Sequence, residues 1–112
     1  MSKPSQRATS RYALEAARLL GQLIRIGRIE RKITTAELAA RAGISRALLY
    51  RIERGDPGCS IGATFETAAI VGVQLFAPGA HAVSTLVAAD RERLALLPKS
   101  IRGTAKVVND DF

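Results

Sequence analysis

Basic, aromatic and small side chains recur near the middle of the chain, at spacings of one, four, five and eight residues from Arg46. In an α-helix these spacings fall on one side. The planar fork of an arginine can donate two hydrogen bonds to O6 and N7 of a guanine, and a small side chain can meet a thymine methyl group. The residues are Arg46, Ala47, Tyr50, Arg51 and Arg54. Together they have the chemistry to contact base edges and phosphates.

The element that presents these side chains is expected to be a helix over residues 46–54. Ser45 precedes it and is a good N-cap residue, because its hydroxyl can accept from an unpaired amide of the first turn. Leu49 and Ile52 lie three residues apart and are predicted to face inwards. One side of this helix therefore packs and the other is exposed.

A preceding helix is expected over residues 35–42. Thr34 and Glu37 have the spacing of a capping box, which satisfies the amides at a helix start. Gly43 follows, and a residue without a side chain can adopt the left-handed conformation that ends a helix. Since Ser45 starts another helix two residues later, the two segments are predicted to form a helix-turn-helix hairpin.

The same spacing also fits an ordinary helical hairpin whose arginines only contact solvent. The distribution of charge along the chain favours nucleic acid as the partner of these arginines. Residues 1–54 hold twelve Lys or Arg against four acids, residues 55–97 hold two against four, and residues 98–112 hold three against two. Positive charge is concentrated in the half that carries the hairpin, as in polyanion-binding surfaces. A membrane surface fits less well, because the sequence shows no long lysine-rich amphipathic helix with bulky aromatic residues.

Catalysis, metal binding and disulfide bonding have little support in the sequence. His81 and Cys59 are the only histidine and the only cysteine, and neither has partners at metal-ligand spacing. A chain of 112 residues has room for one modest core. We therefore expect no enzyme activity, no cofactor and no metal. The polar start and the lack of a long apolar run predict neither a signal peptide nor a membrane span, and hence a cytoplasmic protein.

Hydrophobic periodicity and helix breakers predict an all-α fold. The expected helices cover residues 11–31, 35–42, 46–54, 61–71 and 80–97. Pro98 ends the last helix, because proline cannot continue one. The expected divisions are a flexible arm over 1–10, a domain built on the hairpin over 11–76, a C-terminal helix for dimerisation or packing over 77–98, and a tail over 99–112.

Residues 20–75 resemble the lambda-repressor-like helix-turn-helix domain, also called the Cro/C1-type or xenobiotic-response-element family. The matching segments, in order, are LGQLIRIGR, ITTAELAARAGIS, RALLYRIERG and SIGATFETAAIVGVQL. The resemblance implies a five-helix domain that binds double-stranded DNA. In this chain the first helix is extended, and a C-terminal helix and a tail are added.

The resemblance also implies roles for individual residues. Thr35, which follows the N-cap of the second helix, is expected to touch a phosphate. The residues expected to meet the major groove are Ser45, Arg46, Ala47, Tyr50 and Arg51. Arg28, late in the first helix, is expected to pair with Glu53 as structural support.

The first helix has a second apolar stripe beside the one that faces the core. Its members are Tyr12, Ala16, Leu19, Leu23 and Ile26. Either the last helix covers this stripe or another protein does. A homodimer is expected in both cases, because one recognition helix contacts few base pairs, whereas two related by twofold symmetry bind palindromic half-sites about 34 Å apart. We expect the self-contact on the last helix, whose apolar positions are Val83, Leu86, Val87, Leu94 and Leu97.

The tail, KSIRGTAKVVNDDF, has no helical period. It is either a disordered end or a recognition segment, in which Val107 and Val108 add as a strand to a partner and Phe112 fills an apolar pocket. A small Cro/C1-type domain with an extra helix and such a tail resembles the HipB-like antitoxins encoded beside HipA-type kinase toxins. This resemblance implies a bacterial protein that binds a toxin, represses its own operon and lies on the nucleoid when DNA-bound.

The sequence thus predicts a sequence-specific transcriptional repressor, with the antitoxin role as one account of its biology. A second account is a stand-alone regulator of phage type, which shares the DNA-binding mechanism and differs only in the partner. A third, from another class, is a docking module whose basic face binds an acidic protein without specific DNA binding.

Overall fold

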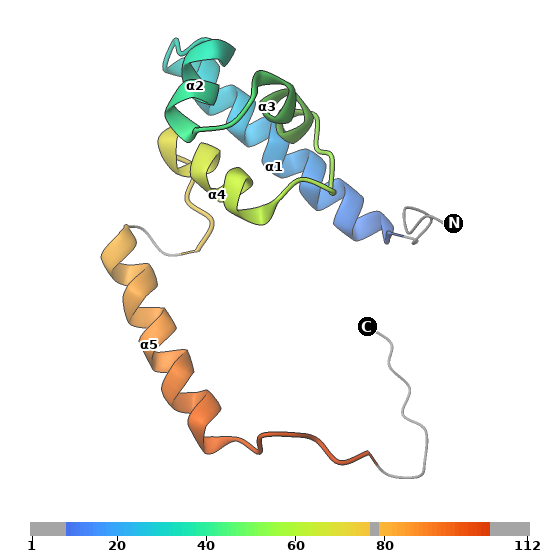
Figure 1. The fold of residues 1–112 in the computed structure, drawn as a ribbon, viewed down its shortest axis with the longest axis vertical. Coiled ribbons are helices and arrows are strands. Elements are labelled where there is room, and N and C mark those ends of the chain that lie inside the picture. The colour runs from blue at the N-terminus through green and yellow to red at the C-terminus, as the bar shows by residue number, and fades with distance from the viewer. Residues whose placement is uncertain (1–8, 77–78, 104–112) are drawn as a thin grey trace. The chain divides into compact units, whose positions relative to one another are not determined.

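The computed structural model of the protein describes residues 9–76 and 79–103, and within them the chain is all-helical (Figure 1). The helices are α1 (Arg11–Glu30), α2 (Thr35–Ala42), α3 (Arg46–Glu53), α4 (Ile61–Ile70) and α5 (Ala80–Leu96). The expected all-α fold is confirmed. Every expected helix begins at the residue predicted from the sequence, and α1, α3, α4 and α5 each end one residue earlier than predicted.

Hydroxyl side chains start the first four helices. Each N-cap oxygen accepts a hydrogen bond from the amide three residues further on, at 3.0 to 3.1 Å. The N-caps are Ser10, Thr34, Ser45 and Ser60. Glu37 also accepts from the Thr34 amide at 2.9 Å, which completes the predicted capping box. Gly43 ends α2 with φ +72°, so the predicted left-handed turn is confirmed as well.

The chain divides into two units, Met1–Leu75 and Phe76–Phe112. In the first, which we call the N-terminal unit, α2 packs on α3 and α4, and α1 packs on the same two helices. The side chains that form its core are Ile24, Ile33, Leu38, Ala39, Leu49, Ile52, Ala68 and Val71. Leu49 and Ile52 thus face inwards as predicted, and their burial fixes the opposite side of α3 towards solvent.

Gly21 allows α1 and α3 to approach closely. A Cβ atom at this position would lie 2.5 Å from the carbonyl oxygen of Ile52 and 2.7 Å from that of Glu53. Any side chain would therefore push the last turn of α3 away from α1. The back of α3 is held against α1 by backbone packing, which leaves the helix little freedom to rotate or shift.

The second apolar stripe of α1 is exposed. Tyr12, Leu19, Leu23 and Ile26 all have large exposed fractions, and none of the helices α2 to α4 covers them. In the second unit, α5 also exposes its apolar side chains. These are Val83, Leu86, Val87, Leu94 and Leu97.

The two ends of the chain lie largely outside the described residues. Leu97 caps α5 in an extended conformation and Pro98 follows it, so the helix stops before the proline as expected. Residues 99–103 are not helical. The predicted arm, apart from positions 9 and 10, and the predicted tail contacts Val107, Val108 and Phe112 fall outside the part of the chain that the structure describes.

Candidate DNA-binding site

The outward face of α3 carries the whole set of side chains expected there. All five are exposed: Arg46, Ala47, Tyr50, Arg51 and Arg54. Tyr50 is the one large hydrophobic side chain on this face, and it is 60% exposed. A short helix with one side buried in a core and two or more arginine forks on the other can enter a DNA major groove.

The start of α2 lies beside the start of α3. Thr35, the first residue of α2, lines one shallow hollow together with Arg46, Ala47 and Tyr50. The structure thus brings the expected phosphate contact next to the expected base contacts, although they are more than ten residues apart in the sequence. The N-terminal end of α2 adds to this side, since helix N-termini attract phosphate.

Ser45 has a structural task besides its expected contact with DNA. Its hydroxyl oxygen accepts a hydrogen bond from the Leu48 amide at 3.0 Å and so caps α3. The side chain remains exposed. Because a hydroxyl can accept and donate at once, its hydrogen is the part that is left for a phosphate.

Arg51 and Arg54 are held in different ways. The guanidinium carbon of Arg54 lies 5.0 Å from the centre of the Tyr50 ring, which is within cation–π range. Arg51 Nε donates to Asp56 Oδ2 at 2.7 Å. The other carboxylate oxygen, Oδ1, accepts from the Gly58 amide at 2.8 Å. Arg51, Arg54 and Asp56 line a second shallow hollow on this side of the unit.

The link between Arg51 and Asp56 was not anticipated from the sequence. The pKa of the Asp56 carboxyl group is lowered, first by the Gly58 amide and then by the Arg51 hydrogen bond, and the pKa of Arg51 is raised by the same bond. Both groups are therefore charged at neutral pH. The sequence does contain a signal for this pair: an aspartate follows the arginine five residues later, just after the glycine that ends the helix.

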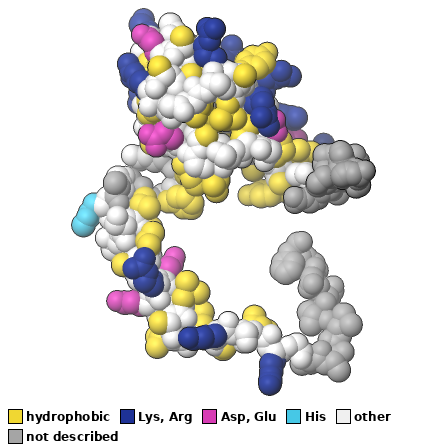
Figure 2. Space-filling model, in the orientation of Figure 1, with side chains coloured by type: hydrophobic (Ala, Val, Ile, Leu, Met, Phe, Trp, Pro, Cys, Tyr) yellow, Lys and Arg dark blue, Asp and Glu magenta, His cyan; other side chains and the backbone are white. Residues whose placement is uncertain are grey.

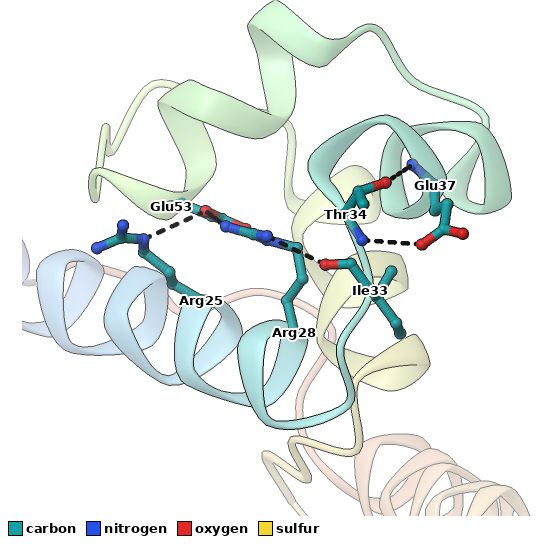
Figure 3. A network of polar contacts seen from close by, with 6 residues as sticks. All are labelled: Arg25, Arg28, Ile33, Thr34, Glu37 and Glu53. Atoms are coloured by element: carbon teal, nitrogen blue, oxygen red, sulfur yellow. Dashed lines mark hydrogen bonds and ion pairs between the residues drawn. The ribbon is translucent and has the colours of Figure 1, made fainter.

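A largely buried ion pair, Arg28 with Glu53, links α1 to the end of α3 (Figure 3). Arg28 donates from Nε to Glu53 Oε2 at 2.7 Å and from Nη2 to Oε1 at 3.1 Å, which confirms the pairing that the family resemblance implied. Its Nη1 also donates to the Ile33 carbonyl at 3.1 Å. The two charged side chains are only 11% and 6% exposed. This network joins the end of α1, the chain before α2 and the end of α3.

Basic side chains are numerous on the N-terminal unit (Figure 2). Twelve of the seventeen Lys and Arg residues fall within positions 1–54, which also contain α2 and α3. Each exposed cation near a phosphate releases condensed counterions from DNA, so such a surface favours binding that depends on salt.

Comparison with protein-family models matches residues 19–74, which are half of the chain, to a helix-turn-helix domain. The chain belongs to this helix-turn-helix family. The match supports the lambda-repressor-like part of the resemblance and indicates a DNA-binding regulator, of a kind that is typically not an enzyme. The matched segment of this helix-turn-helix protein runs from the middle of α1 to the residues after α4, and so includes every candidate DNA contact named above. Comparison with curated proteins found no match.

The thiol and the imidazole of this helix-turn-helix protein belong to segments other than α3. Cys59 packs against the core, and burial, followed by the charge of Asp56, raises the pKa of its thiol. His81 is exposed on α5. Among residues 9–76 and 79–103, no three His, Cys, Asp or Glu side chains are grouped so as to hold a metal ion. None of the helices in these two stretches is both long and apolar enough to cross a membrane.

Proposed function

We propose that this protein is a sequence-specific transcriptional repressor that binds a palindromic operator as a homodimer. The observation that carries the proposal is the exposed face of α3, where Arg46 and Arg51 face solvent while the opposite side of the helix is buried. In this proposal α3 enters the major groove, and a bound dimer blocks access to the promoter. The protein acts in the cytoplasm and lies on the nucleoid when bound to DNA.

We assign a role to each side chain of the site from its chemistry. Arg46 and Arg51 contact guanine O6 and N7, while Ala47 meets a thymine methyl group. Thr35 donates a hydrogen bond to a phosphate, which sets the position of α3 without reading sequence, and Ser45 meets the DNA at the edge of the major groove. Arg54, stacked on Tyr50, adds a cation for the DNA backbone.

The homodimer is proposed because a single recognition helix reads too few base pairs to define a site. Self-association through α5 is supported by the exposed apolar side chains that this helix carries, among them Leu86, Leu94 and Leu97. Exposed apolar surface of this kind is typical of interfaces. The stripe of α1, which includes Leu19 and Leu23, remains available for a second protein contact.

Selection of bound DNA from a random pool with the purified full-length chain tests this proposal. We expect enrichment of a palindrome with half-sites about one helical turn apart, roughly 34 Å. Binding to the selected DNA should weaken steeply with salt, with a log-log slope of several units, because several cations release counterions. No enrichment together with a flat salt response would instead favour the module that docks an acidic protein.

We further propose that the repressor is the antitoxin of a toxin and antitoxin pair, bound to a HipA-like kinase toxin. Support comes from the resemblance of the extra helix and tail to HipB-like antitoxins. The tail residues Val107, Val108 and Phe112 are proposed to bind the toxin, by strand addition and by filling an apolar pocket.

Deletion of residues 109–112 removes Phe112, the proposed aromatic anchor. We expect it to weaken binding to a kinase encoded beside this gene by about tenfold or more, since a buried aromatic anchor contributes much of an interface's binding energy. Operator affinity of the same variant should be unchanged, because the N-terminal unit is intact. The measurement is calorimetric titration of the purified kinase. Unchanged affinity for the kinase would reject the tail contact, and a gene without a kinase neighbour would favour the stand-alone, phage-type regulator.

A further inference from the structure

Asp56 makes two hydrogen bonds that fix its carboxylate beside the recognition helix. Oδ1 accepts from the Gly58 amide at 2.8 Å, and Oδ2 accepts from Arg51 Nε at 2.7 Å. The side chains of Arg51 and Asp56 are 51% and 36% exposed, so the pair lies at the surface rather than in the core. A surface pair of this kind contributes little to stability. Its geometry therefore calls for another explanation.

The loop that holds Asp56 packs closely against α1. Gly55 reverses the chain after α3 with φ +83°, and a Cβ atom there would lie 2.6 Å from the Arg18 Cα of α1. The Asp56 amide donates to the Arg51 carbonyl at 3.0 Å. Asp56 is thus placed by backbone contacts that do not depend on the Arg51 side chain.

The bond to Asp56 uses one particular nitrogen of Arg51. With Nε engaged, the two terminal nitrogens, Nη1 and Nη2, are left as a pair of donors that matches guanine O6 and N7. An unrestrained arginine side chain has many rotamers, and it must lose that freedom when it binds a base. A carboxylate that already restricts the guanidinium lowers this cost. Arg46, on the first turn of α3, shows no ion pair among the described residues, so the two arginines of the face differ in this respect.

We propose that Asp56 is a positioning residue for base recognition, which orients Arg51 so that its Nη1 and Nη2 meet a guanine. The inference rests on the proposed function, because it requires that α3 read DNA. If Asp56 has this role, it must affect the affinity for the operator differently from the affinity for random DNA. A carboxylate close to DNA weakens binding to every sequence by repulsion from phosphates, whereas orientation of Arg51 strengthens binding only to the sequence that contains the guanine.

Asp56→Asn separates these two effects. The asparagine oxygen can still accept from the Gly58 amide, but its NH2 group cannot accept from Arg51. We expect affinity for random DNA to stay equal or rise, while the ratio of operator to random-DNA affinity falls by about 3- to 30-fold, which lies within the range of typical pairwise couplings. Asp56→Ser, whose hydroxyl can also accept from the Gly58 amide, is the second variant. Thermal unfolding of both variants, compared with the parent protein, checks that they are folded.

Two controls isolate the role of Arg51. Glu66→Gln removes one exposed carboxylate from α4 of the same unit, and it should leave the affinity ratio unchanged. In an Arg51→Ala background, Asp56→Asn should have no further effect on the ratio. Replacement of the contacted guanine by 7-deazaguanine, which lacks the N7 acceptor, should lower the operator affinity of the parent protein by a larger factor than it lowers that of the Asp56→Asn variant.

The outcomes distinguish this inference from the proposed function. If the parent protein shows no preference for any selected site, the proposed function fails and the inference fails with it. If the parent prefers its operator and both Asp56 variants keep that preference, only the inference is overturned. An equal loss of preference in the presence and absence of Arg51 would also overturn it, because Asp56 would then act directly on the DNA.

Discussion

Arg28→Met is expected to lower the free energy of unfolding of the N-terminal unit by about 3–5 kcal/mol, the usual cost of leaving one member of a buried ion pair without its partner. Glu53 is 6% exposed, and its two oxygens accept from Arg28. Methionine fills part of the space but donates nothing to the carboxylate or to the Ile33 carbonyl. Chemical denaturation measured by circular dichroism gives the free energy directly.

Arg25→Met is the matched control in the same network. Arg25 is 62% exposed and its Nε lies 4.0 Å from Glu53 Oε1, so its loss should change stability by less than about 1 kcal/mol. Glu53→Leu added to Arg28→Met should recover much of the lost stability, because the uncompensated charge is then gone. Equal effects of the Arg25 and Arg28 variants would show that burial of the pair has no energetic consequence.

Arg46→Ala and Arg51→Ala are each expected to weaken binding to the selected operator by about 1–3 kcal/mol, the cost of losing a bidentate guanine contact. Both side chains are exposed on α3, so their removal should leave the fold intact. Fluorescence anisotropy with labelled operator and with random DNA at one salt concentration measures both affinities. The loss should be several times larger on the operator than on random DNA.

Arg41→Ala is the control for charge. Arg41 is an exposed arginine near the end of α2 and was not expected to contact bases. It should change both affinities by a similar factor and leave their ratio unaltered. If Arg46→Ala or Arg51→Ala behaves in the same way as Arg41→Ala, that arginine contacts phosphate and does not read a base.

Helix boundaries were predictable because the signals for them are local. The capping box of Thr34 and Glu37 spans four residues, and Gly43 ends α2 by its own conformational freedom. The inward side of α3 was also predictable, since Leu49 and Ile52 repeat at the helical period. In each case the deciding residues lie within one or two helical turns of each other.

Contacts between helices were less predictable from the sequence. Gly21 gave no sign in the sequence that a side chain there would collide with the Ile52 carbonyl, because the collision exists only when α1 and α3 meet. The pairing of Arg28 with Glu53 was expected only through the family resemblance, and its 25-residue separation in the chain gives no local cue. The restraint of Arg51 by Asp56 was missed, although the two lie only five residues apart, because it depends on how the chain turns after α3.

The sequence by itself determined where the helices begin, which side of α3 is buried and which arginines lie outwards, since these follow from hydrogen-bond caps and from a period of 3.6 residues. Only the tertiary structure decided that Thr35 lies beside Arg46 and Tyr50, that Glu53 is buried against Arg28, and that Arg51 is already held. These features require distant segments or a reversed chain to meet, and such meetings are set by the packing of the whole core rather than by neighbours in sequence.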